Sequence, residues 1–116
     1  MADLWCVSDT DLVDLTPAKM RELIVDCFFH AQKETLARAS SAMQMPSGDD
    51  DLRLTITSAV RRAFDEVDGD FEQPDKASIM GCLGVLARKA EIWGTPSEVI
   101  EHHKGEMMRA MSALPE

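Results

Sequence analysis

Two groups of polar side chains with helical spacing are the first candidates for chemistry in this sequence. They are the ladders Glu22/Asp26/His30 and Glu98/His102/Glu106. A spacing of four residues places the members of each ladder on one face of an α-helix. Carboxylates and imidazoles on two facing helices could hold a divalent metal ion. Each ladder also lies on the most polar stripe of its helix, and a solvated helix surface is the alternative to a metal site. We therefore assign no catalytic, cofactor-binding or metal-binding residue.

The last helix supplies a second enzymatic alternative. Glu98 and Glu101 form a Glu-x-x-Glu pair, which resembles one half of the acidic motif of all-α nucleoside triphosphate pyrophosphohydrolases. The second half, a similar pair on a neighbouring helix, is missing from the chain. An N-cap at Thr95 with a capping-box Glu98 explains the same residues. The enzymatic alternative is therefore a metal-dependent phosphohydrolase that uses the carboxylates of the first and last helices.

Other ligand and nucleophile patterns are incomplete. Cys27 and His30 make one zinc-ligand pair, which Cys82 or His103 would have to complete. His103 lies on the apolar face of its helix, where a buried histidine bonded to a neighbouring helix is the ordinary structure and an acid–base role is the alternative. The chain has no Gly-x-Ser-x-Gly sequence, phosphate loop or dinucleotide fingerprint. No cofactor is expected.

Helix start and stop signals divide the chain into the elements that position these side chains. Thr16 and Pro17 supply an N-cap and a first-turn proline. Gly94 is suited to a left-handed helix end, after which Thr95 starts the last helix. No alternating pattern predicts a strand. The expected fold is all-α, a small four-helix bundle with helices near residues 17–43, 50–67, 75–93 and 96–113.

The first fifteen residues are expected to form an N-terminal arm packed on the bundle. Ser8 and Asp11 have the spacing of a capping box and predict one short turn in this arm. Residues 16–116 then form a single helical domain, because a chain of 116 residues has room for one core.

The charge and the cysteine content limit which binding partners and which cellular compartment we expect. The net charge is −9, and the chain does not gather Lys and Arg as phosphate binding requires, so we expect no nucleic acid and no anionic membrane. An acidic face for a basic protein partner is an alternative use of this charge. Three cysteines without a CxxC pair, and an N-terminus unlike a signal peptide, indicate a cytoplasmic protein. Cys27 and Cys82 fall on apolar faces and are expected to be buried and reduced.

The first helix carries more apolar surface than one small core covers. One face holds Met20, Leu23, Ile24, Cys27, Phe28 and Ala31, and a second face holds Val25, Phe29, Leu36 and Met43. The third helix has a second face with Ser78, Gly81, Val85 and Ile92, and Gly84 beside it. A helix with two apolar faces is either central to its bundle or covered by another chain. We therefore predict a homodimer that pairs through the first helix, the third helix or both.

The presence of two glycines inside the third helix requires a structural explanation. A glycine in a helix interior costs about 1 kcal/mol relative to alanine. Gly81 and Gly84 therefore predict a close helix crossing that leaves no room for a side chain. A tolerated surface position is the alternative.

These observations lead to three functional hypotheses. The first is a small acidic helical protein, not an enzyme, that self-associates and serves as a protein-interaction module. The second is the metal-dependent phosphohydrolase described above. The third is a binder of a small apolar ligand, held among some of the eight methionines of the chain.

Overall fold

The fold is an all-α bundle, as the sequence predicts. The computed structural model describes residues 5–38 and 48–114, and no strand occurs in these two segments. The helices are α1 (Asp9–Leu12), α2 (Pro17–Arg38), α3 (Asp49–Glu66), α4 (Lys76–Ile92) and α5 (Ser97–Ala113). The expected continuation of α2 to residue 43 lies outside the described residues. None of the described helices has the length and apolar character needed to cross a membrane.

Local capping explains where several helices begin and end. The Thr16 hydroxyl accepts a hydrogen bond from the Lys19 amide at 3.2 Å, as expected for an N-cap of α2. Ser8 and Asp11 form the predicted capping box at the start of α1. Asp75 and Ser78 form another at the start of α4. After α4, Gly94 adopts a φ of 84°, the left-handed conformation predicted for it.

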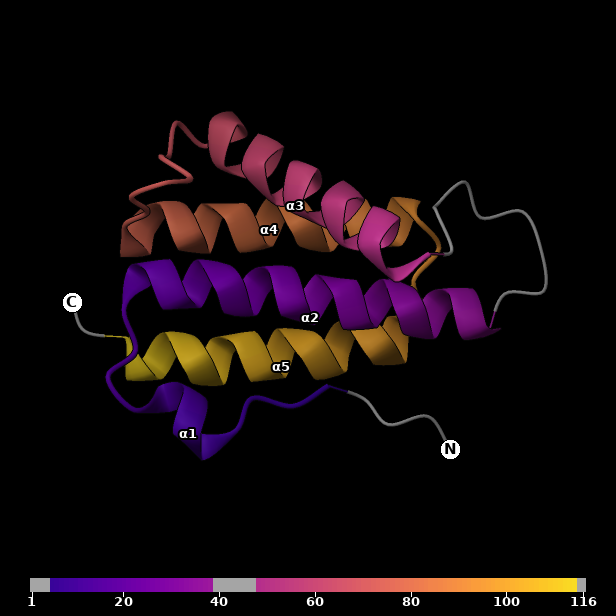
Figure 1. The fold of residues 1–116 in the computed structure, drawn as a ribbon, viewed down its shortest axis with the longest axis horizontal. Coiled ribbons are helices and arrows are strands. Elements are labelled where there is room, and N and C mark those ends of the chain that lie inside the picture. Colours follow the sequence, from indigo (N-terminus) through magenta and orange to yellow (C-terminus); the bar gives the residue numbers. More distant parts are fainter. Residues whose placement is uncertain (1–4, 39–47, 115–116) are drawn as a thin grey trace.

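Helix α2 is the central helix of the bundle. Figure 1 shows α2 between α5 on one side and α3 with α4 on the other, and α2 contacts all three of these helices. Val25 and Phe29, on the second face of α2, are only 9% and 6% exposed. The guanidinium group of Arg53, on α3, lies over the Phe29 ring, 4.4 Å from the ring centroid. The expectation that this face is left over for another chain is wrong at Val25 and Phe29, because the rest of the chain buries both side chains.

The second face of α4 is divided between buried and exposed side chains. Val85 is buried within the chain, contrary to expectation, whereas Ile92 is 81% exposed. The close crossing predicted here is confirmed at Gly81, where an added Cβ would lie 2.9 Å from Val67 Cγ1. At Gly84 the same prediction is wrong, because an added Cβ would meet no atom of residues 5–38 or 48–114 within 4 Å.

Substitution of the two glycines by alanine should have opposite effects on the free energy of unfolding. Gly84→Ala should raise the free energy of unfolding by about 1 kcal/mol, because alanine favours the helix and meets open space. Gly81→Ala should lower it by about 1 kcal/mol, because the clash with Val67 exceeds the gain in helix propensity. Urea unfolding of the two variants measures both effects, and equal responses would contradict the difference in packing.

Candidate functional site

The polar ladder of α5 binds the N-terminal arm. His102 Nε2 donates to the Trp5 carbonyl oxygen at 2.9 Å. Glu106 Oε1 accepts from the Val7 amide at 2.7 Å. One turn further on, Arg109 donates to the Val7 carbonyl at 2.6 Å and to the Asp9 carboxylate at 2.7 Å. His102 and Glu106 are therefore structural partners of the arm, and the expectation of a solvated stripe is wrong for them.

The polar ladder of α2 is divided between two neighbours. Asp26 forms an ion pair with Arg53 of α3 at 2.7 Å. His30, one turn later, stacks on the Trp5 ring with 6.3 Å between ring centroids. Within residues 5–38 and 48–114, no three His, Cys, Asp or Glu side chains are placed to hold a metal ion.

All three histidines of the chain gather at Trp5, and His103 is the most deeply buried of them. The His103 ring lies 6.2 Å from the Trp5 ring and 5.0 Å from the His102 ring, centroid to centroid. It is 3% exposed, and neither ring nitrogen has a hydrogen-bond partner in the described part of the chain. Burial, reinforced by His102 and His30, lowers the pKa of His103 to about 4. Its burial was predicted correctly, but the predicted bond to a neighbouring helix is absent among these residues.

The two cysteines inside the bundle are poor nucleophiles. Cys27 on α2 and Cys82 on α4 are fully buried, as predicted. Burial raises the pKa of Cys27 and raises that of Cys82 to about 12. Because the thiolate is the reactive form, both side chains are inert at neutral pH.

A thiol titration of the native protein checks this assignment. Cys6 is exposed and should react rapidly with a thiol reagent, whereas Cys27 and Cys82 should react only on unfolding. The measurement is the number of thiols modified before and after addition of urea. Three rapidly reacting thiols would show that the interior described here opens readily in solution.

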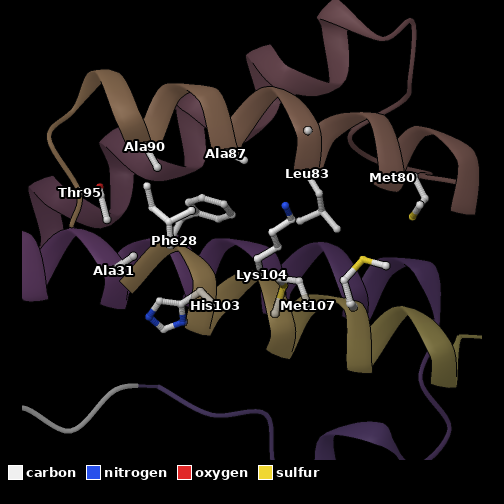
Figure 2. Close-up of a pocket in the computed structure, with 13 residues that line it drawn as sticks. Phe28, Ala31, Met80, Leu83, Ala87, Ala90, Thr95, His103, Lys104 and Met107 are labelled. Carbon is white, nitrogen blue, oxygen red and sulfur yellow. The ribbon is translucent and has the colours of Figure 1, made fainter. Parts of the chain in front are cut away.

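An apolar groove lies between α4 and α5. Its volume is about 350 Å³, and Phe28 and Ala31 of α2 contribute to its lining. Figure 2 shows the groove with the side chains that line it. They are Phe28, Ala31, Met80, Leu83, Gly84, Ala87, Ala90, Thr95, Ile100, His103, Lys104, Met107 and Met108.

Small residues on α4 leave the room for this groove. Gly84 and Ala87 are one turn apart and lie on the same face of the helix. Among the described residues, an added Cβ at Gly84 would contact nothing within 4 Å. Met80 on α4 and Met108 on α5 are 48% and 49% exposed, and the more deeply placed Met107 is buried. The sequence pattern of α4 contained these positions, but nothing in it distinguished an open groove from a helix crossing.

Three polar residues line the otherwise apolar groove. The Thr95 hydroxyl accepts a hydrogen bond from the Gln32 side-chain amide at 2.8 Å, and both residues are buried. The His103 ring is tilted by 36° relative to the Trp5 ring, which lies 6.2 Å away. The Lys104 side chain extends from α5 across the groove toward α4 (Figure 2).

The position of Thr95 corrects the predicted start of the last helix. Helix α5 begins at Ser97 with Pro96 as its N-cap, and no side chain caps it. The Pro96 carbonyl accepts from the amides of Val99 and Ile100 at 3.0 Å. Because its hydroxyl is bonded to Gln32 inside the bundle, Thr95 is not the predicted N-cap, and Glu98 does not form the predicted capping box with it.

Comparisons with known proteins assign no family to this chain. No protein-family model, curated protein or solved structure matches it. A function has to be inferred from the geometry of the chain itself.

Proposed function

We propose that this protein binds a small, predominantly apolar ligand in the groove between α4 and α5. The observation that carries the proposal is an apolar groove of about 350 Å³ that Gly84 leaves unfilled. Ligand sites in proteins are commonly concave and apolar, with a few polar groups and volumes of roughly 300–1,000 Å³. Since an apolar cavity of about 150 Å³ accepts benzene, the groove has room for a medium-length acyl chain or two fused rings.

The methionines of the groove suit this role. Met side chains are unbranched and polarizable, so they adapt to ligands of different shape. Met80 and Met108 are about half exposed at the groove. A bound ligand would remove this apolar surface from water, which is the main driving force for binding of this kind.

Filling the groove tests the proposal. In Gly84→Leu, a branched side chain would occupy the groove, whereas Gly105→Leu makes the same change on α5 at a position that also has open space and does not line the groove. The probes are octanol and 1-naphthol, titrated by calorimetry into each protein. Gly84→Leu should weaken binding at least about tenfold, the equivalent of about 1.4 kcal/mol, and Gly105→Leu should leave it unchanged.

Two outcomes would contradict ligand binding in the groove. One is the absence of binding by either probe to the unmodified protein. The other is equal binding by Gly84→Leu and Gly105→Leu, which would place the probes elsewhere. Circular dichroism of both variants establishes that they remain helical.

Self-association is the second candidate function. Two copies of the chain would pair through the α4–α5 face that contains the groove. The exposed Met80 and Met108 side chains lie on the α4–α5 face and offer an adaptable apolar contact for a second copy of the chain. This pairing would use α4, the third of the four predicted helices, but not the covered second face of α2. Sedimentation velocity over increasing protein concentration tests it: Met108→Glu should shift a dimer toward monomer. A monomer at every concentration would contradict it.

A further inference from the structure

We infer that the ligand of the groove is an amphiphile with an anionic head group and that Lys104 binds this head. The inference rests on the proposed function, because it assigns a chemical class to the ligand of the same groove. Lys104 is the one charged residue among the side chains that line the groove, apart from the titratable His103. The other lining groups favour an apolar body, so a ligand that satisfies the whole groove has an apolar part and an anionic part.

The other two polar residues of the groove offer no positive charge to such a head group. Thr95 accepts from Gln32. His103 lies beside the Trp5 ring, and burial lowers its pKa to about 4, so its ring is neutral at pH 7. This leaves the ammonium of Lys104 as the cationic group of the groove. An ammonium is a compact charge with three donors, which suits a carboxylate or sulfonate.

Lys104 is available for this contact. Its side chain crosses the groove toward α4 (Figure 2). Lys33, Arg53, Arg61 and Arg109 form ion pairs with carboxylates of the described segments, and none of these pairs includes Lys104. Glu101, one turn earlier on α5, is not a lining residue of the groove. A ligand head can therefore approach the ammonium without displacing one of these pairs.

The overall charge of the protein opposes anion binding only weakly at physiological salt. The net charge of −9 repels an anionic ligand at long range. At an ionic strength of about 0.15 M the Debye length is about 8 Å, so exposed carboxylates beyond this distance are largely screened. A contact with Lys104 is shorter than this length and is less screened. The local cation therefore decides the sign of the interaction.

Octanoate and octanol separate the role of the head group from that of the groove. Both ligands have the same apolar chain, and only octanoate carries a charge at neutral pH. Calorimetric titrations use the unmodified protein, Lys104→Met and Lys19→Met. The last variant loses the same charge at an exposed position outside the groove. Lys104→Met should weaken octanoate binding about three- to tenfold, because it removes a charge-assisted contact that is partly exposed.

Octanol is the internal control. Its affinity should be equal, within about twofold, in all three proteins, because methionine retains the apolar stem of lysine. Octanoate should bind to Lys19→Met as it does to the unmodified protein. If Lys104→Met changes octanoate and octanol binding alike, Lys104 acts by packing alone and the head-group inference is wrong, although the groove remains a binding site. If neither ligand binds to the unmodified protein, the proposed function itself is wrong.

Discussion

Acidification from pH 6.5 to about 4 is expected to remove roughly 3 kcal/mol from the free energy of unfolding through His103. Burial lowers the pKa of this histidine from 6.5 to about 4 in the folded protein. Between these values the unfolded chain binds more protons than the folded one, so stability rises with pH. The contribution is fully present above pH 6.5 and is lost as the pH falls toward the folded pKa. Urea unfolding at a series of pH values measures it.

The variant His103→Leu tests whether His103 is the group that makes stability depend on pH. Leucine has no titratable group, so this variant should lose most of the slope between pH 4 and pH 6.5. It should be at least as stable as the unmodified protein at pH 7, because the two ring nitrogens it removes are buried without partners in the described part of the chain. A small slope should remain, since burial also lowers the pKa of His30. An unchanged slope in His103→Leu would show that another group dominates.

The carboxyl group of Asp75 does not obscure this measurement. The backbone and side chain of Ser78 lower the pKa of Asp75 below its ordinary value of 3.8. Stability from this N-cap is therefore lost only at pH values below 3.8. The two groups act in separate pH ranges, and the range above pH 4 reports on the histidines.

Local rules explain how much of the fold could be predicted from the sequence. The α1 capping box, the N-cap of α2 and the left-handed Gly94 depend on residues within one turn of each other, and all three were predicted correctly. Helical periodicity also predicted correctly that Cys27, Cys82 and His103 are buried. The cover of the second face of α2 depends on which helices surround it, and periodicity carries no information on that. Val25 and Phe29 look the same in sequence whether α3 or a second chain covers them.

The contacts of the N-terminal arm could not be predicted from the sequence, for a related reason. Glu106 and Val7 are 99 residues apart, and the group that Glu106 binds is a backbone amide. Every residue except proline has such an amide, so the sequence of the arm gives no sign of the pairing. A ladder that binds a distant backbone and a ladder that faces water have the same residue pattern.

The groove shows the limit of sequence patterns most directly. Gly81 and Gly84 lie in the same helix with the same apparent role. Val67 packs against Gly81, whereas no residue of the described segments packs against Gly84. The difference is set by the end of α3, which reaches one glycine and not the other. The methionine-rich composition did suggest an adaptable binding surface. Only the structure shows that Met80, Met107 and Met108 line one groove.

Thr95→Val is expected to lower the free energy of unfolding by about 2 kcal/mol. The Thr95 hydroxyl is the acceptor for the side-chain amide of Gln32, which is fully buried. The other end of that amide, Gln32 Oε1, already has no partner among the described residues. Valine keeps the shape of threonine but removes the acceptor, so both polar atoms of the Gln32 amide would be buried unpaired. Urea unfolding at pH 7 measures the loss.

The double variant Gln32→Met/Thr95→Val distinguishes this hydrogen bond from a capping role. Replacing both partners by apolar side chains of similar size removes the unpaired groups, so the double variant should be more stable than Thr95→Val by about 1–2 kcal/mol. If Thr95 instead capped α5, its loss would cost about 1 kcal/mol whatever residue stands at position 32. Additive effects in the cycle would therefore contradict the buried bond. Coupled effects would mean that Thr95 fixes α5 to α2, at the end of the groove that Thr95 lines.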